Sequence, residues 1–95
     1  MEDENRFVLR LYVAGMSINS MIAIENVTRI CDEYLEGAFE LDIIDIYKHP
    51  TIAEEEQIVF SPSLIKILPE PKRVFIGNFS DKERLIKGLG IHLKE

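Results

Sequence analysis

Residues able to do chemistry are few and widely spaced in this sequence. The one cysteine, Cys31, cannot form an internal disulfide, and hydrophobic spacing places it on the apolar face of a predicted helix. Burial raises a thiol pKa, so we expect Cys31 to be an unreactive core residue. Neither histidine has a cysteine or second histidine at ligand spacing, and no glycine-rich phosphate loop or hydrolase motif occurs. The sequence therefore offers no residue pattern for metal binding or hydrolase chemistry, and we expect no cofactor.

Adjacent carboxylates and a pair of serines are the remaining candidates. Glu54, Glu55 and Glu56 are consecutive, so on a helix they point in different directions, which favours a solvated face over a paired-carboxylate site. Ser17 and Ser20 fall at the predicted start of the first helix. Hydroxyl groups there satisfy free backbone N–H groups, and we interpret both serines as helix caps.

Length and composition predict one small domain spanning residues 1–95. The chain has 95 residues, 46% of them hydrophobic, with a formal net charge of -6. This charge repels phosphate backbones and anionic lipid headgroups, which argues against nucleic-acid and membrane-surface binding. No run of 18 apolar residues occurs and no export signal opens the sequence, so we expect a cytoplasmic protein that does not span a membrane.

Hydrophobic periodicity predicts secondary-structure elements in the order βαβαββα. The predicted strands are 7–13, 39–46, 64–68 and 73–76, and the predicted helices are 18–36, 51–59 and a last one opened by Ser80. Ser17 is expected to cap the first helix and Gly37 to end it. Thr51 with Glu54, and Ser80 with Glu83, form capping boxes that are expected to open the other two helices. The apolar residues of the last helix, Leu85, Ile86 and Leu89, should face inward.

This order of elements matches the plan of the thioredoxin fold, an α/β architecture. In that fold a Cys-x-x-Cys motif begins the first helix, where the helix dipole stabilises the thiolate. Here the position reads Ser17-Ile18-Asn19-Ser20, and because serine has no redox couple, disulfide exchange is excluded at this site. Residues 1–5 carry three acids and are expected to form a disordered N-terminal tail.

Charge is distributed unevenly along the chain. Residues 25–57 hold ten acidic and two basic residues, whereas residues 58–95 hold four acidic and seven basic residues. Solvated helix faces are the simplest interpretation, because surface charges contribute little to stability. The asymmetry would also let one copy dock on another, or present an acidic face to a basic partner.

Short strings are more specific than the order of elements. They are Leu11-Tyr12-Val13-Ala14-Gly15, Asn19-Ser20, Ile44-Asp45, Ala53-Glu54-Glu55, Ser61-Pro62-Ser63-Leu64, Lys66-Ile67-Leu68-Pro69 and Ile76-Gly77-Asn78-Phe79-Ser80-Asp81. In this order and spacing they strongly resemble the KaiB family of bacterial clock proteins over about residues 7–91. The sensor domain of the SasA histidine kinase resembles the pattern more loosely.

The resemblance implies a non-enzymatic protein that docks on a KaiC-type ATPase, in a pathway where a SasA-like kinase is a competitor. It also implies two folds of one sequence: a monomeric thioredoxin-like state, βαβαββα, and a tetrameric ground state, βαββααβ. Residues 50–91 would rearrange between them, and the Ser61–Pro62 bond is expected to be cis in the thioredoxin-like state. Gly88 and Gly90 each cost about 1 kcal/mol relative to alanine in a helix, so we place the hinge there.

The second predicted strand is expected to lie at a sheet edge, where unpaired backbone groups can bind a partner's strand. It carries Glu40 and Asp42 around Leu41, where clock members resemble Ala-Leu-Lys. These two acids are our candidate partner-binding residues. Their charge makes the clock protein KaiA a doubtful partner.

An enzyme of the same fold is the alternative hypothesis. A glutathione-dependent or redox enzyme lacking the usual Cys-x-x-Cys would hold a peptide beside Pro62 and activate a thiol with Ser17 or Ser20. The missing cysteine, and the lack of a basic residue near Ser17 to polarise glutathione, argue against it.

Overall fold

One four-stranded mixed sheet forms the centre of the computed structural model, which describes residues 6–58 and 62–91. The strands are β1 (Phe7–Val13), β2 (Phe39–Asp45), β3 (Ser63–Leu68) and β4 (Arg73–Ile76), and the helices are α1 (Ile18–Tyr34), α2 (Pro50–Glu55) and α3 (Lys82–Leu89). The strand order is β2-β1-β3-β4, with β1 parallel to β2 and antiparallel to β3, and with β4 antiparallel to β3. The predicted order βαβαββα is confirmed.

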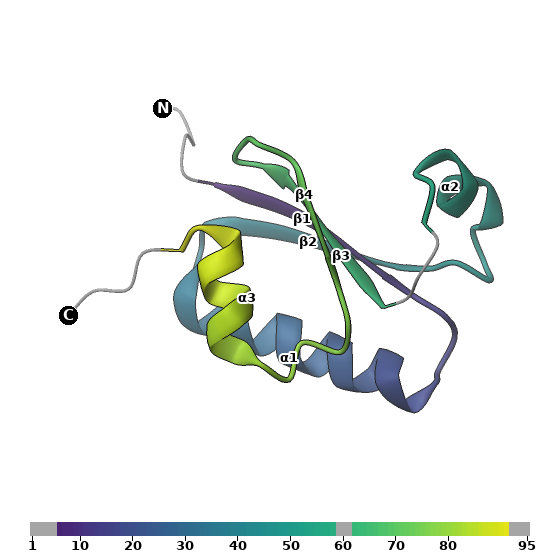
Figure 1. The fold of residues 1–95 in the computed structure, drawn as a ribbon, viewed down its shortest axis with the longest axis horizontal. Helices are drawn as coiled ribbons and strands as arrows, with labels where there is room; N and C mark the ends of the chain where they lie inside the picture. Colours follow the sequence, from purple (N-terminus) through teal and green to yellow (C-terminus); the bar gives the residue numbers. More distant parts are fainter. Residues whose placement is uncertain (1–5, 59–61, 92–95) are drawn as a thin grey trace.

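The hydrophobic core lies between one face of the sheet and the helices α1 and α3. Figure 1 shows these two helices together on that face, with α2 well apart from α3. Alternation in β1 directs Leu9 and Leu11, both 0% exposed, into this core. The inward residues of α3 are Leu85, Ile86 and Leu89, as expected, and all three are buried.

Two predicted helix starts are wrong. The helix α2 begins at Pro50 with His49 as N-cap and no side-chain cap, so Thr51 does not form a capping box. Proline suits the first helical position because its missing N–H would be unpaired there in any case. In α3 the cap is Asp81, whose carboxylate accepts from the N–H of Arg84 at 3.2 Å, and not Ser80.

The other boundaries differ by one or two residues. Helix α1 ends at Tyr34, earlier than the predicted residue 36, and β2 ends at Asp45, one residue early. Helix α2 is the exception: it ends at Glu55, so the prediction that it continues to residue 59 is wrong. The predicted N-terminal tail lies outside the described residues. The turn between β3 and β4 contains two cis peptide bonds, Leu68–Pro69 and Glu70–Pro71.

Candidate functional site

Ser17 is the N-cap of α1, as predicted, whereas Ser20 lies in the first turn of the helix and is not a cap. The N–H of Ser20 donates to Ser17 Oγ at 3.2 Å, and Ser17 Oγ donates to Ser20 Oγ at 2.8 Å. The N–H of Ala14 donates to Ser20 Oγ at 3.1 Å, which ties the end of β1 to the helix. Ser20 is only 1% exposed. These hydroxyl groups therefore organise the turn that elsewhere in the thioredoxin fold carries the redox cysteines.

Asp45, at the end of β2, supports the same turn, a role that the sequence patterns did not predict. Its Oδ1 atom accepts from the N–H of Gly15 at 3.1 Å and from that of Tyr47 at 2.9 Å. Gly15 adopts a φ of 64°, a conformation that glycine reaches without steric cost. Two features of the sequence could have indicated this contact: Gly15 follows the end of β1, and Asp45 is the last residue of β2.

Cys31 is 1% exposed in the core, as expected. Burial, and then the nearby carboxylate of Asp32, raise the pKa of its thiol to about 12. The thiol is thus protonated throughout the physiological pH range, and it is not a nucleophile. Among the described residues no cluster of His, Cys, Asp and Glu could hold a metal ion.

We expect two measurable consequences of the raised Cys31 pKa. At pH 8 the folded protein should react with iodoacetamide about a thousandfold more slowly than an unfolded control, because the thiolate population falls tenfold for each unit of pKa. Because the unfolded chain releases the thiol proton first, near pH 9.0, the free energy of unfolding should also fall between pH 9.0 and about 12. A Cys31→Ala variant should lack this component of the slope. If iodoacetamide labelled the folded protein as fast as the unfolded control, the raised pKa of Cys31 would be contradicted.

Strand β2 forms one edge of the described sheet, as predicted, and pairs there with β1. The N–H of Phe7 donates to the carbonyl of Ala38 and that of Ile46 to the carbonyl of Val13, so the even-numbered residues of β2 bond to β1. The N–H and C=O groups of Leu41 and Ile43 therefore point away from the sheet, toward any added strand.

Glu40 and Asp42 are brought together at this edge and both are exposed. They lie on the face opposite the core, because Phe39 and Leu41 pack against the core cluster. Glu40 Oε1 lies 4.0 Å from Arg6 Nη2, with more than half of its side chain exposed. The edge thus offers free backbone groups beside two accessible carboxylates.

The remaining predicted site residues lie between positions 62 and 90. Gly88 sits inside α3 against Phe75, where an added Cβ atom would lie 2.5 Å from Phe75 Cε2. Gly90 is the C-cap of α3, with a φ of 80°. Pro62 is buried and precedes β3, but its bond to Ser61 lies outside the described residues.

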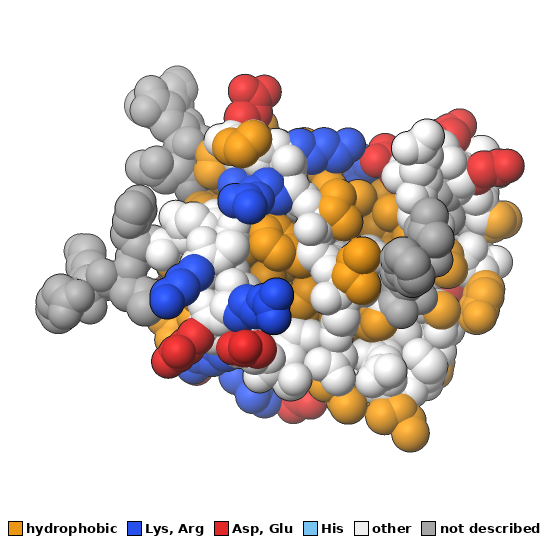
Figure 2. Space-filling model, in the orientation of Figure 1, with side chains coloured by type: hydrophobic (Ala, Val, Ile, Leu, Met, Phe, Trp, Pro, Cys, Tyr) orange, Lys and Arg blue, Asp and Glu red, His pale blue; other side chains and the backbone are white. Residues whose placement is uncertain are grey.

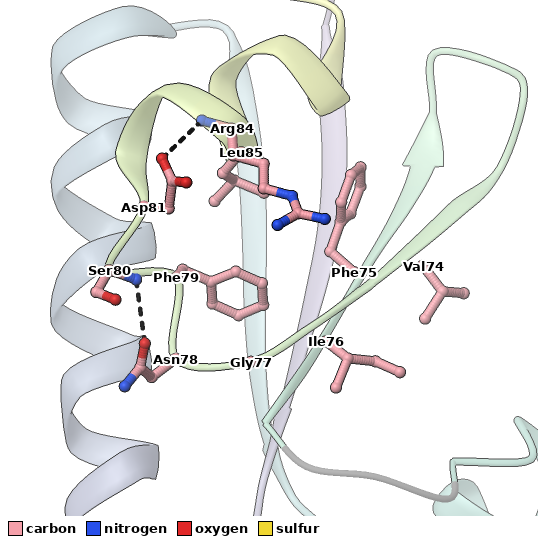
Figure 3. A pocket seen from close by; sticks show the side chains of 10 residues that line it. All are labelled: Val74, Phe75, Ile76, Gly77, Asn78, Phe79, Ser80, Asp81, Arg84 and Leu85. Atoms are coloured by element: carbon pink, nitrogen blue, oxygen red, sulfur yellow. Dashed lines mark hydrogen bonds between the residues drawn. The ribbon is translucent and has the colours of Figure 1, made fainter.

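A pocket that the sequence did not predict lies between β4, α3 and the loop that joins them. It has a volume of about 430 Å³. Figure 3 shows Phe75 and Phe79 facing it, with the Arg84 side chain reaching between them from α3. Its lining residues fall between Val74 and Leu85, and Phe75 of β4 meets Arg84 of α3 only when the helix packs beside the strand.

Fold and site together define a thioredoxin-like protein with serines where the redox cysteines would be. The KaiB domain model matches residues 10–91, so the chain belongs to the KaiB family. It is 47% identical over 89 residues to the circadian clock protein KaiB3 of Synechocystis sp., covering 94% of this chain and 87% of that protein. It is 44% identical to the circadian clock oscillator protein KaiB of Nostoc punctiforme, covering 94% and 86%.

Solved structures show the same fold. The N-terminal domain of Synechococcus elongatus SasA aligns with a TM-score of 0.71 and 24% identity, covering 90% of this chain and 84% of that one. Thioredoxin of Fasciola hepatica aligns with a TM-score of 0.72 and 16% identity, covering 93% and 82%. Among the described residues no helix is long and apolar enough to cross a membrane.

Proposed function

We propose that this protein is a non-enzymatic KaiB-type regulator that docks on a KaiC-type ATPase. Membership of the KaiB family over residues 10–91 carries the proposal. The serines at the start of α1 support a binding role, because Ser17 caps the helix, Ser20 ties it to the end of β1, and their position lacks a thiol. A kinase with a SasA-like sensor domain would compete for the same ATPase, since that sensor has this fold.

The free edge of β2 is the proposed docking element. The outward backbone groups of Leu41 and Ile43 can extend the sheet into a partner strand, and backbone pairing of this kind supplies affinity without side-chain specificity. Glu40 and Asp42 then select a partner with basic residues at the matching positions. KaiA remains a doubtful partner, because Glu40 and Asp42 give this strand two negative charges that the clock members lack.

Fold switching would involve residues 50–91, which include α2, β3, β4 and α3. In the thioredoxin-like state described here, β4 is a four-residue edge strand with a largely exposed surface. By contrast, β1 and the first helix supply most of the buried core. An element with so little burial is a suitable part of a segment that rearranges.

Reversing the edge charges tests the docking site. We expect Glu40→Lys with Asp42→Lys to weaken binding to a KaiC-type ATPase by roughly tenfold or more, because like charges would then face the basic residues of the partner. The matched control is Glu54→Lys with Glu55→Lys, two exposed acids on α2. Affinities are measured by fluorescence anisotropy, with amide spectra confirming the fold of each variant. Unchanged affinity of the β2 variant would contradict β2 docking, and no binding by the parental protein would contradict the proposed partner.

A further inference from the structure

The strand at the opposite edge, β4, also presents free backbone groups. The N–H of Gly77 donates to the carbonyl of Pro62 at 3.1 Å, in line with the register that pairs Ser63 with Ile76. Hydrogen-bonded and non-hydrogen-bonded pairs alternate along antiparallel strands. The N–H and C=O groups of Val74 and Ile76 therefore point outward from the sheet. Their side chains are 56% and 60% exposed.

The pocket runs along this same edge. Phe75 points to the helix side of the sheet and packs partly against the core, while Phe79 and Leu85 are buried at the pocket wall. Arg84 supplies the positive group (Figure 3). In Figure 2, hydrophobic side chains gather at the centre of this face, with Lys and Arg side chains to their left and above, and with acidic side chains beside the lower of these. The apolar side chains of the pocket and the Arg84 guanidinium thus lie directly beside the outer edge of β4.

Two arginines lie at this edge, Arg73 on β4 and Arg84 on α3. Among the described residues Arg73 and Arg84 form no ion pair. Burial, and then the nearby Arg73, lower the pKa of Lys66, so a second cation lies close to that arginine. Asp81 also lines the pocket and adds one negative charge there, with its carboxylate held at the start of α3 by the N–H of Arg84.

We infer that β4 and its pocket bind an extended segment of a partner protein in which acidic and apolar residues alternate. A strand added beside β4 directs successive side chains to opposite faces of the sheet. On the helix side they meet Arg73, Phe75 and Arg84, which favours Asp or Glu. On the other side they cover Val74 and Ile76, which favours apolar residues.

A second copy of this chain fits the edge less well. Its β2 also alternates acidic and apolar residues, but Glu40 and Asp42 lie on the face opposite the helices. In a joined sheet with the helices of both copies on one side, these acids would cover Val74 and Ile76 instead of facing the arginines. The partner segment is therefore an acidic peptide from another protein.

A capped peptide of alternating valine and glutamate is the probe for this site. Titration into the isotope-labelled protein should shift the amide resonances of residues 73–85 and slow hydrogen exchange at the N–H groups of Val74 and Ile76. The same peptide with lysine in place of glutamate should bind at least roughly tenfold more weakly, the difference expected for a charge-assisted hydrogen bond. Equal affinity of the two peptides, or shifts confined to β2, would overturn the inference.

Substitutions at β4 and α3 test whether the peptide binds at this edge. We expect Arg84→Glu to weaken glutamate-peptide binding by roughly tenfold. Ile76→Pro removes an outward N–H without removing a bond to β3, so it should weaken binding while the fold is kept. Arg29→Glu, at an exposed position on α1, is the matched control and should bind as the parental protein does. Peptide-independent, concentration-dependent shifts at both β2 and β4 would assign the edge to a second copy and overturn the inference. Because β2 and β4 are opposite edges, failure here leaves the ATPase proposal intact.

Discussion

Replacing Leu11 by alanine should lower the free energy of unfolding by about 2 to 5 kcal/mol. Leu11 is 0% exposed and lies on the interior strand β1, so alanine leaves a cavity between the sheet and α1. Small domains have only about 5 to 15 kcal/mol of total stability. The substitution should therefore populate unfolded molecules at moderate urea concentrations, measured by circular dichroism.

The matched control for Leu11→Ala is Ile18→Ala. Ile18 is 77% exposed, so its truncation should change the free energy of unfolding by less than about 0.5 kcal/mol. Equal stability losses in the two variants would mean that the core is not where the structure places it.

Replacing both Gly88 and Gly90 by alanine should destabilise α3 instead of strengthening it. Helix propensity alone favours alanine by about 1 kcal/mol at Gly88. However, the added Cβ atom would meet Phe75, and overpacking of this kind costs about 1 to 3 kcal/mol. At Gly90 the φ of 80° makes any side chain strained, by about 1 to 2 kcal/mol. Hydrogen exchange across α3 should accelerate, and the population of the thioredoxin-like state should fall.

Two variants separate packing from a general effect on the helix. Lys87→Ala changes an exposed residue of α3 and should leave hydrogen exchange unaltered. Phe75→Leu should partly rescue Gly88→Ala, because a smaller side chain gives the new methyl group room. If the Gly88→Ala, Gly90→Ala variant showed unchanged hydrogen exchange and a single set of resonances, neither glycine would be needed for the stability of α3.

The strands and the core-facing residues of β1 were predictable from alternation, although Tyr12 on the opposite face of β1 is also 0% exposed. Phe7, Leu9, Leu11 and Val13 are all buried, as their spacing requires. Helix starts were less predictable, because neighbouring residues can serve as caps with similar energies. Ser80 and Asp81 are both good N-cap residues, and the structure uses Asp81.

The pocket beside β4 could not be predicted in the same way. Phe75 and Arg84 belong to different elements and meet only after α3 packs on the sheet. Periodicity assigns each residue to a face of its own element but does not give the distance between elements. The β2 edge was predictable, because the order of elements in the thioredoxin plan determines which strand lies outermost.

The opposite edges of the sheet give this molecule an electric dipole. Acidic residues gather at β2 and basic residues at β4 and α3, with three strand spacings, roughly 14 Å, between the edges. This separation exceeds the Debye length of about 8 Å at physiological ionic strength, so an approaching partner feels the sign of the nearer edge and not the net charge. At low ionic strength the two fields extend further and turn the molecule before contact, which raises the rate of productive encounters.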